Sequence, residues 1–185
     1  NLDLVARRGA RLTSMYSGGP TCTPARAALM TGRIAPRTGA ARVLFPGDNR
    51  GMNPNEVTMG AYLKGLGYAT GCFGKWHLGD KKPFEPMAQG FDYHYGMYSN
   101  LDPVETVYFG DEGVPILRNG QIVKRSAEPA ELTNLYTQEA IQFFKRNKDK
   151  PFFLYLPHTM LHVPLGVSPK FQGTSKWGEY GDAIQ

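Results

Sequence analysis

Residues 58–73 read TMGAYLKGLGYATGCF and carry the helix-then-strand order on which the fold is built. Thr58 is a good N-cap for a helix that runs through Leu66, and Gly67 ends that helix. Residues 68–73 then form a strand-like run, and a polar loop over residues 74–80 leaves it. This stretch predicts a helix, a strand and a polar loop in direct succession.

The same order recurs on both sides of this stretch. Upstream, residues 2–8 predict a short helix and residues 10–16 alternate toward a strand. Downstream, the clearest helix begins at Thr133, and the apolar run 152–156 is typical of a central parallel strand covered on both faces. Three helix-then-strand units predict an α/β sandwich with a largely parallel central sheet flanked by helices. Ligands of such sheets bind beyond the carboxyl ends of the strands.

The remaining segments predict one more helix, a loop and a hairpin. Thr23 is a suitable N-cap with Pro24 in the first helical position, and Gly32 stands where a C-terminal glycine belongs. Residues 34–56 lack a clear period and predict an ordered irregular loop. Residues 91–95 predict a short extended piece, and a hairpin turns at Asn119-Gly120.

Composition bounds the class of protein. With 41% apolar and 20% charged residues, a chain of 185 residues buries one substantial core. Its longest purely apolar run, residues 152–156, is far shorter than the ~20 residues of a membrane span. Asn1 follows no initiator methionine or leader, and residues 180–185 stop as if inside a helix, so we expect a fragment of a longer chain. Cys22 and Cys72 permit one disulfide without requiring it.

The positive charge gathers at the start of the chain. Residues 1–56 hold eight arginines, no lysine and three acidic residues. The net charge of this segment, +5, equals that of the whole chain. Because the planar guanidinium suits oxyanions, an anionic substrate and a solvated basic face both remain open. A basic stripe interleaved with aromatic residues and a nucleic-acid motif are both missing from the sequence, so nucleic acid is not favoured as a partner.

Residues 22–26 read CTPAR and place a thiol at the entrance to a helix, with Arg26 one turn further on. Free backbone N–H groups and the helix dipole attract anions at such a position. The five residues alone fit equally well a nucleophile beside an anion-binding arginine and a half-buried structural cysteine.

A longer pattern separates these alternatives. Residues 22–33 fit C-x-P-x-R-x-x-x-x-T-G-R, and residues 74–79 read GKWHLG. Both strings resemble signatures of the type I sulfatases, and the whole chain is similar to arylsulfatase A-like enzymes and N-acetylgalactosamine-6-sulfatases. The resemblance implies an alkaline-phosphatase-like fold. It also implies that residues 1–185 are part of a single N-terminal catalytic domain, without its first strand and its C-terminal portion.

The resemblance implies a site and two cofactors. Cys22 would be oxidised to formylglycine (3-oxoalanine), the nucleophile of this family, which also ligates a calcium ion (Ca2+). The other calcium ligands would lie outside the fragment. The residues implied to act with Cys22 are catalytic Arg26 and His77, and substrate-binding Lys75, Ser99 and His162. His158 would support the loop that carries His162.

The implied reaction is hydrolysis of an aryl or carbohydrate sulfate ester. The implied partners are a sulfated small molecule or glycan and a formylglycine-generating or anaerobic maturation enzyme, in a periplasmic, secreted or lysosomal setting. Two alternatives stay open. One is an anion- or sulfated-glycan-binding module without turnover. The other is a cysteine-dependent phosphatase in which Cys22 attacks phosphorus and Arg26 binds the phosphate, although three intervening residues are fewer than the five of that motif.

Overall fold

The fold is built on a mixed sheet whose centre is parallel. The structure is a computed structural model that describes residues 2–101 and 109–185. Within them, five strands pair in the order β4-β3-β2-β1-β5. Strand β1 pairs in parallel with both β2 and β5, while β3 and β4 add an antiparallel hairpin. The strands are β1 (Ala69–Lys75), β2 (Tyr93–Met97), β3 (Pro115–Arg118), β4 (Gln121–Arg125) and β5 (Phe152–Tyr155).

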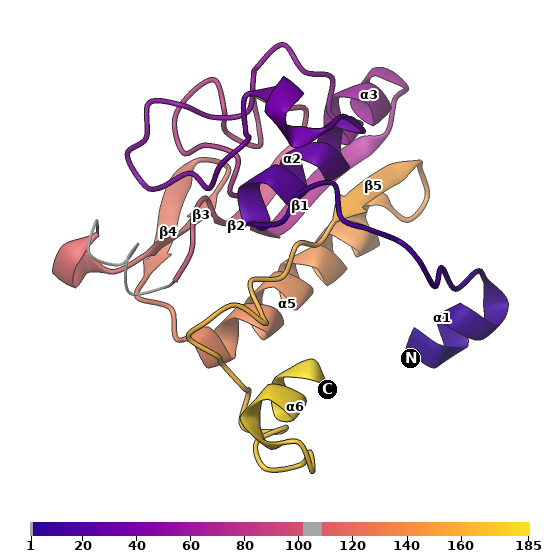
Figure 1. Cartoon of the computed structure of the whole chain (residues 1–185), viewed down its shortest axis with the longest axis vertical. Coiled ribbons are helices and arrows are strands. Elements are labelled where there is room, and N and C mark those ends of the chain that lie inside the picture. Colours follow the sequence, from indigo (N-terminus) through magenta and orange to yellow (C-terminus); the bar gives the residue numbers. More distant parts are fainter. Residues whose placement is uncertain (1, 102–108) are drawn as a thin grey trace.

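Helices cover both faces of this sheet, as Figure 1 shows, so the predicted α/β sandwich is confirmed. Helix α5 (Pro129–Asn147) lies on one face and begins four residues before the expected Thr133, because Pro129 takes the first helical position. Its buried side chains pack against β1, β2 and β5, and the core on this face includes Phe73, Tyr95, Ile116, Leu132, Tyr136 and Phe143.

The opposite face carries α2 (Cys22–Thr31), the 3-10 turn η1 (Ala35–Thr38) and α3 (Met59–Gly65). A second core, with Trp76 near its centre, fills the space between them and the sheet. Helix α3 starts as predicted, because the Thr58 Oγ1 accepts a hydrogen bond from the Ala61 N–H at 3.0 Å. Residues 34–56 form the expected irregular loop, with η1 as its helical turn.

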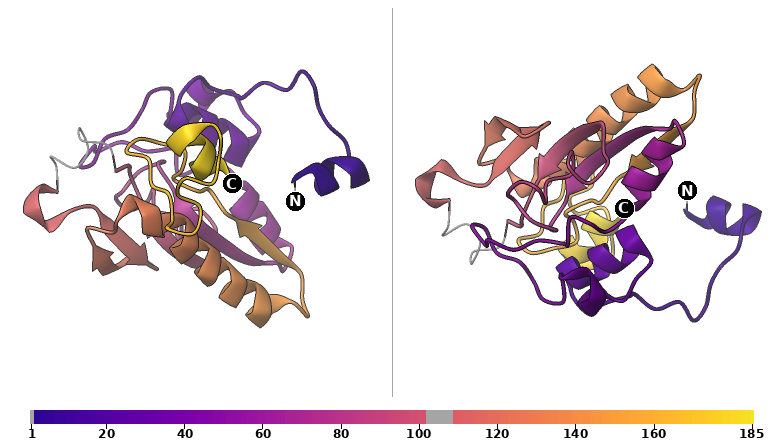
Figure 2. Two further views of the ribbon diagram at one scale, coloured as in Figure 1. Left: turned by 90° about the horizontal axis from the view of Figure 1, so that it is seen from below. Right: turned by 90° about the horizontal axis from the view of Figure 1, so that it is seen from above.

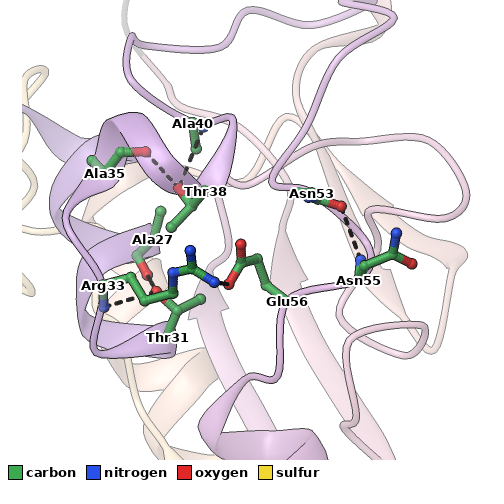
Figure 3. A network of polar contacts seen from close by, with 9 residues as sticks. All are labelled: Ala27, Thr31, Arg33, Ala35, Thr38, Ala40, Asn53, Asn55 and Glu56. Atoms are coloured by element: carbon green, nitrogen blue, oxygen red, sulfur yellow. Dashed lines mark hydrogen bonds and ion pairs between the residues drawn. The ribbon is translucent and has the colours of Figure 1, made fainter.

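The end of α2 shows what the last part of the C-x-P-x-R-x-x-x-x-T-G-R pattern does (Figure 3). Thr31 Oγ1 donates to the Ala27 carbonyl at 2.8 Å and accepts from the Arg33 N–H at 3.2 Å. Gly32 closes the helix in the left-handed region, as predicted, at φ 67°. Arg33 then pairs with Glu56 at 3.3 Å, which ties the helix end to the irregular loop.

Three sequence expectations about the elements are wrong. Residues 10–16 form no strand, and their apolar side chains lie exposed on the segment that leads from α1 (Leu2–Arg8), which stands away from the sandwich in Figure 2. Helix α2 begins at Cys22 with Thr21 as its N-cap, so Thr23 lies inside the helix. Strand β5 lies at the edge of the described sheet and not at its centre.

Strand β5 nevertheless has both faces covered. Phe152 packs edge-on against Phe143 and Phe144 of α5, while Phe153 and Tyr155 stack on Phe91 on the opposite face. The continuous apolar run therefore indicates that both faces of the strand are buried. It does not indicate whether the strand lies at the centre or at the edge of the sheet.

The expected hairpin is confirmed. The hairpin between β3 and β4 turns at Asn119 and Gly120, whose φ values of 49° and 84° both lie in the left-handed region that a type I′ turn requires. The 3-10 turn η2 (Gly110–Glu112) and the short helix α6 (Gly178–Ile184) complete the described elements. Among the residues that the structure describes, none of the helices is long and apolar enough to cross a lipid bilayer.

Candidate functional site

The candidate site lies where the parallel strands β1, β2 and β5 end. Lys75 is the last residue of β1, Asn100 follows β2, and His162 lies in the segment that follows β5. Because these strands are parallel neighbours, their carboxyl ends meet at one edge of the sheet. The first residues of α2 approach the same edge through Arg26, whose Nη1 donates to the Lys75 carbonyl.

Backbone contacts fix the spacing of these strand ends. Gly74 has φ 134° and Gly96 has φ 152°, a backbone conformation that side chains rarely adopt. A Cβ on Gly96 would collide with the Gly74 carbonyl, and a Cβ on Gly74 would collide with the Pro157 carbonyl. The Lys75 N–H also donates to the Pro157 carbonyl at 2.8 Å. The main chain itself therefore sets how closely the three segments approach.

Cys22 and Arg26 line an open cavity of about 740 Å³ together with Tyr155 and Pro157 of the β5 end. The Cys22 side chain is half-buried and carries a free thiol. Burial raises the pKa of the Tyr155 hydroxyl to about 12, against the opposing effect of the positive Arg26 beside it. Tyr155 is therefore neutral near pH 7, and Arg26 supplies a positive charge to the cavity that Cys22 also lines.

His77 is held by a closed set of three hydrogen bonds, which we call the Thr23 ring. Thr23 Oγ1 donates to the His77 carbonyl at 3.0 Å and accepts from the Leu44 N–H at 3.3 Å. The His77 Nε2 lies 2.8 Å from the Leu44 carbonyl. Since a carbonyl oxygen can only accept, Nε2 carries the proton and Nδ1 holds the lone pair of the neutral ring.

The surroundings keep the His77 imidazole neutral. Its side chain is 2% exposed, and its backbone has φ 59°, which is uncommon for a residue other than glycine. Burial lowers the pKa of His77 to about 3, and the positive charges of Lys75 and Arg26 act in the same direction. Near pH 7 the imidazole is therefore neutral, with its lone pair on Nδ1.

Lys75 and His162 are joined through Asn100, which the sequence analysis missed. Lys75 Nζ donates to the Asn100 Oδ1, and the Asn100 Nδ2 lies 3.4 Å from the His162 Nε2. The His162 Nδ1 lies 2.8 Å from the Val163 carbonyl. Asn100 directly follows the candidate Ser99, so the rule that polar residues beyond strand ends meet would have identified it.

Ser99 and His158 lie outside this bridge. Ser99 is buried and lines a small recess next to His77. The His158 ring lies 6.4 Å from the ring of Tyr136, and burial lowers the pKa of this histidine. The structure thus brings Arg26, Lys75, His77 and His162 to one edge and leaves His158 against Tyr136 of α5.

Neither a disulfide nor a metal centre is formed by the described part of the chain. Cys22 and Cys72 are both free, and Cys72 is fully buried, which raises the pKa of its thiol. Within residues 2–101 and 109–185, no three His, Cys, Asp or Glu side chains gather in a way that would hold a metal ion. These two ranges therefore do not fit a calcium site by themselves.

Known proteins match this chain over its whole length. The family model described as Sulfatase matches residues 1–184. An N-acetylgalactosamine-6-sulfatase of Mus musculus is 38% identical over 203 residues, covering 100% of this chain and 39% of the relative. An arylsulfatase of Hemicentrotus pulcherrimus is 34% identical, covering 99% of this chain and 36% of the relative.

A solved structure agrees with these sequence matches. The PsFucS1 sulfatase from Pseudoalteromonas sp. superposes with a TM-score of 0.82 and 31% identity, covering 99% of this chain and 42% of that structure. The chain thus spans about two fifths of the length of the relatives it matches.

Proposed function

Because this chain belongs to the sulfatase family, we propose that the longer protein of which it forms part hydrolyses a sulfate monoester. The observation that carries the proposal is the placement of the Cys22 thiol and the Arg26 guanidinium in one open cavity, at the edge where Lys75 and His162 also meet. On this proposal, residues 1–185 are part of a single catalytic domain.

The charges at this edge suit a sulfate group. Arg26 and Lys75 are cations, and preorganised positive charge usually contributes most to stabilising the transition state of such transfers. We assign Arg26 to the sulfate beside position 22, and Lys75 and His162 to the sulfate oxygens. Ser99, in the recess next to His77, is assigned to the substrate.

His77 is proposed as the base. Its buried ring is neutral near pH 7, its Nε2–H is held by the Leu44 carbonyl, and its Nδ1 has the lone pair that takes a proton from a hydroxyl. A positioned base contributes typically ~10²–10⁴-fold to a rate. The proton for the leaving ester oxygen comes, on the family pattern, from either Lys75 or His162.

Formylglycine at position 22 fits the surroundings of Cys22. The Cys22 thiol is free, half-buried and open to a cavity, whereas the Cys72 thiol is enclosed in the core. Of these two thiols, that of Cys22 is therefore the one accessible to a maturation enzyme. When formed, formylglycine supplies a hydroxyl of a hydrated aldehyde as the nucleophile. The proposed calcium needs ligands from parts of the longer protein outside residues 1–185, and we derive no step through it.

The substrate class is an aryl or carbohydrate sulfate, in line with the names of the relatives. A sulfated small molecule or glycan is therefore the proposed partner, together with a formylglycine-generating or anaerobic maturation enzyme. A periplasmic, secreted or lysosomal location is proposed from the family alone.

The proposal is tested on the full-length protein by peptide mass spectrometry and by sulfate release from nitrophenyl sulfate. We expect position 22 to carry the mass of formylglycine, and Cys22→Ala to abolish sulfate release. Cys72→Ala removes the other thiol and serves as the matched control that retains turnover. An unmodified Cys22 together with full activity of Cys22→Ala would refute the assignment. Binding of sulfated glycans without any release would favour a binding module instead.

A further inference from the structure

We propose that Asn100 is a positioning residue that holds Lys75 as a donor and His162 as an acceptor. This inference rests on the proposed function and decides which member of the pair holds a proton for the substrate. Its basis is the chain of contacts from Lys75 Nζ through the Asn100 amide to the His162 ring and on to the Val163 carbonyl.

The orientation of the Asn100 amide is forced by Lys75. An ammonium group has three donors and no acceptor, so the atom that meets Lys75 Nζ must be the amide oxygen. The amide nitrogen then points to the His162 ring, at 3.4 Å from Nε2. Because an amide NH2 group can only donate, Nε2 must hold a lone pair.

The other side of the His162 ring leads independently to the same tautomer. Nδ1 lies 2.8 Å from the Val163 carbonyl oxygen, which can only accept, so Nδ1 carries the ring proton. Both contacts therefore assign His162 as the Nδ1–H tautomer. His77 has the opposite tautomer, because its Nε2–H faces the Leu44 carbonyl. The two histidines of the site thus present different nitrogens as acceptors.

Burial explains why an amide stands at this position. Lys75 is 1% exposed and Asn100 is 2% exposed, and a buried ammonium requires hydrogen-bond acceptors to offset its lost hydration. A carboxylate in place of Asn100 would supply an acceptor but would also cancel the positive charge. The neutral amide supplies an acceptor that orients the ammonium and adds no negative charge beside it.

The consequence is a division of roles. Lys75 is the donor of the pair, and His162 in its neutral form offers Nε2 as an acceptor. Of the two candidates for protonating the leaving oxygen, Lys75 is therefore the one whose proton is already in place.

The test is a nitrogen NMR spectrum of the full-length protein that contains isotope-labelled histidine, with the His162 signals assigned by their loss in His162→Gln. In the wild-type protein near neutral pH we expect a protonated Nδ1 and an unprotonated Nε2. Asn100→Asp keeps the side-chain shape and the oxygen that faces Lys75. It replaces the amide nitrogen that faces His162 with a carboxylate oxygen, which can only accept a hydrogen bond, so the His162 Nε2 should become protonated. Asn147→Asp is the matched control, since Asn147 is a buried asparagine that donates to the Phe143 carbonyl, far from the site.

Two results would overturn the inference: a protonated Nε2 in the wild-type protein, or an unchanged His162 spectrum in Asn100→Asp. The wild-type spectrum decides even if the variant fails to fold. In kinetics with nitrophenyl sulfate, we expect kcat/KM of Asn100→Asp to fall about 10²-fold, the size of effect that small misplacements of site groups produce. Wild-type protein that shows the expected tautomer but releases no sulfate would refute the proposed function and leave the role of Asn100 standing.

Discussion

Thr23→Val is the sharpest perturbation of the His77 environment, because valine has nearly the same shape as threonine and lacks only the hydroxyl. Thr23 is fully buried, and its hydroxyl forms two sides of the Thr23 ring. The substitution removes the acceptor of the Leu44 N–H and the donor to the His77 carbonyl. Both groups lie in the interior, where water does not replace the lost partner.

The expected magnitude follows from these two contacts. Leaving one buried polar group without its partner costs about 1–3 kcal/mol, and the contact at 3.3 Å belongs at the low end of that range. We therefore expect the free energy of unfolding to fall by about 2–4 kcal/mol. Because Leu44 also fixes the His77 ring, turnover of nitrophenyl sulfate should fall by about 10²-fold in protein that is still folded.

Denaturant unfolding and steady-state kinetics of the full-length protein measure both effects. Thr38→Val is the matched control, because Thr38 is equally buried and also donates to a carbonyl, that of Ala35 at 2.7 Å, and accepts from the Ala40 N–H at 3.4 Å (Figure 3). It should lose similar stability and keep its turnover, while Thr23→Ser should restore both properties. Equal kinetics for the two valine variants would refute the positioning role of the ring.

Three further predictions concern other parts of the chain. His77→Ala should lower turnover by ~10²–10⁴-fold if the ring is the base, measured as sulfate release with Thr38→Val alongside, and near-normal turnover would contradict the role. Burial alone would raise the pKa of Asp92, but hydrogen bonds from Lys64 and Thr70 hold this pKa below its ordinary value. The stability that the Asp92 carboxylate contributes is therefore present above about pH 4 and is lost as the pH falls further. Asp92→Asn should flatten the decline of the unfolding free energy between about pH 5 and pH 2, and an unchanged slope would refute this role of Asp92. Gly96→Ala should lower the free energy of unfolding by at least about 1–3 kcal/mol, because of the backbone conformation at this position. Gly65→Ala in α3, where a Cβ meets open space, should be neutral or slightly stabilising. Equal urea midpoints for the two variants would contradict the close contact at Gly96.

Local signals account for the elements that the sequence predicted correctly. Thr58 caps α3 through its own hydroxyl, Gly32 closes α2 in the left-handed region, and Asn119-Gly120 turns the hairpin. Each of these depends on contacts within a few residues, which is the range over which a sequence pattern carries information.

The errors come from partners that are distant along the chain. Residues 10–16 alternate like a strand, but a strand needs a neighbour, and none of the described strands pairs with them. Thr23 has the right chemistry for an N-cap, but its hydroxyl is used by Leu44 and His77. The same division applies to the candidate site. The two signature motifs supply its proposed residues, while the Asn100 bridge depends on a meeting of strand ends that only the tertiary structure supplies.

The contact among Gly74, Gly96 and Pro157 has a consequence for engineering. Main-chain atoms set the distance between the neighbouring segments there, so the side chains of the surrounding loops do not determine it. Randomising the exposed positions of the irregular loop at residues 45–50, next to the recess beside His77, should therefore retune substrate preference without disturbing the frame that holds the charged groups. Such a library keeps Gly74, Gly96 and Pro157 constant and varies only the exposed positions within residues 45–50.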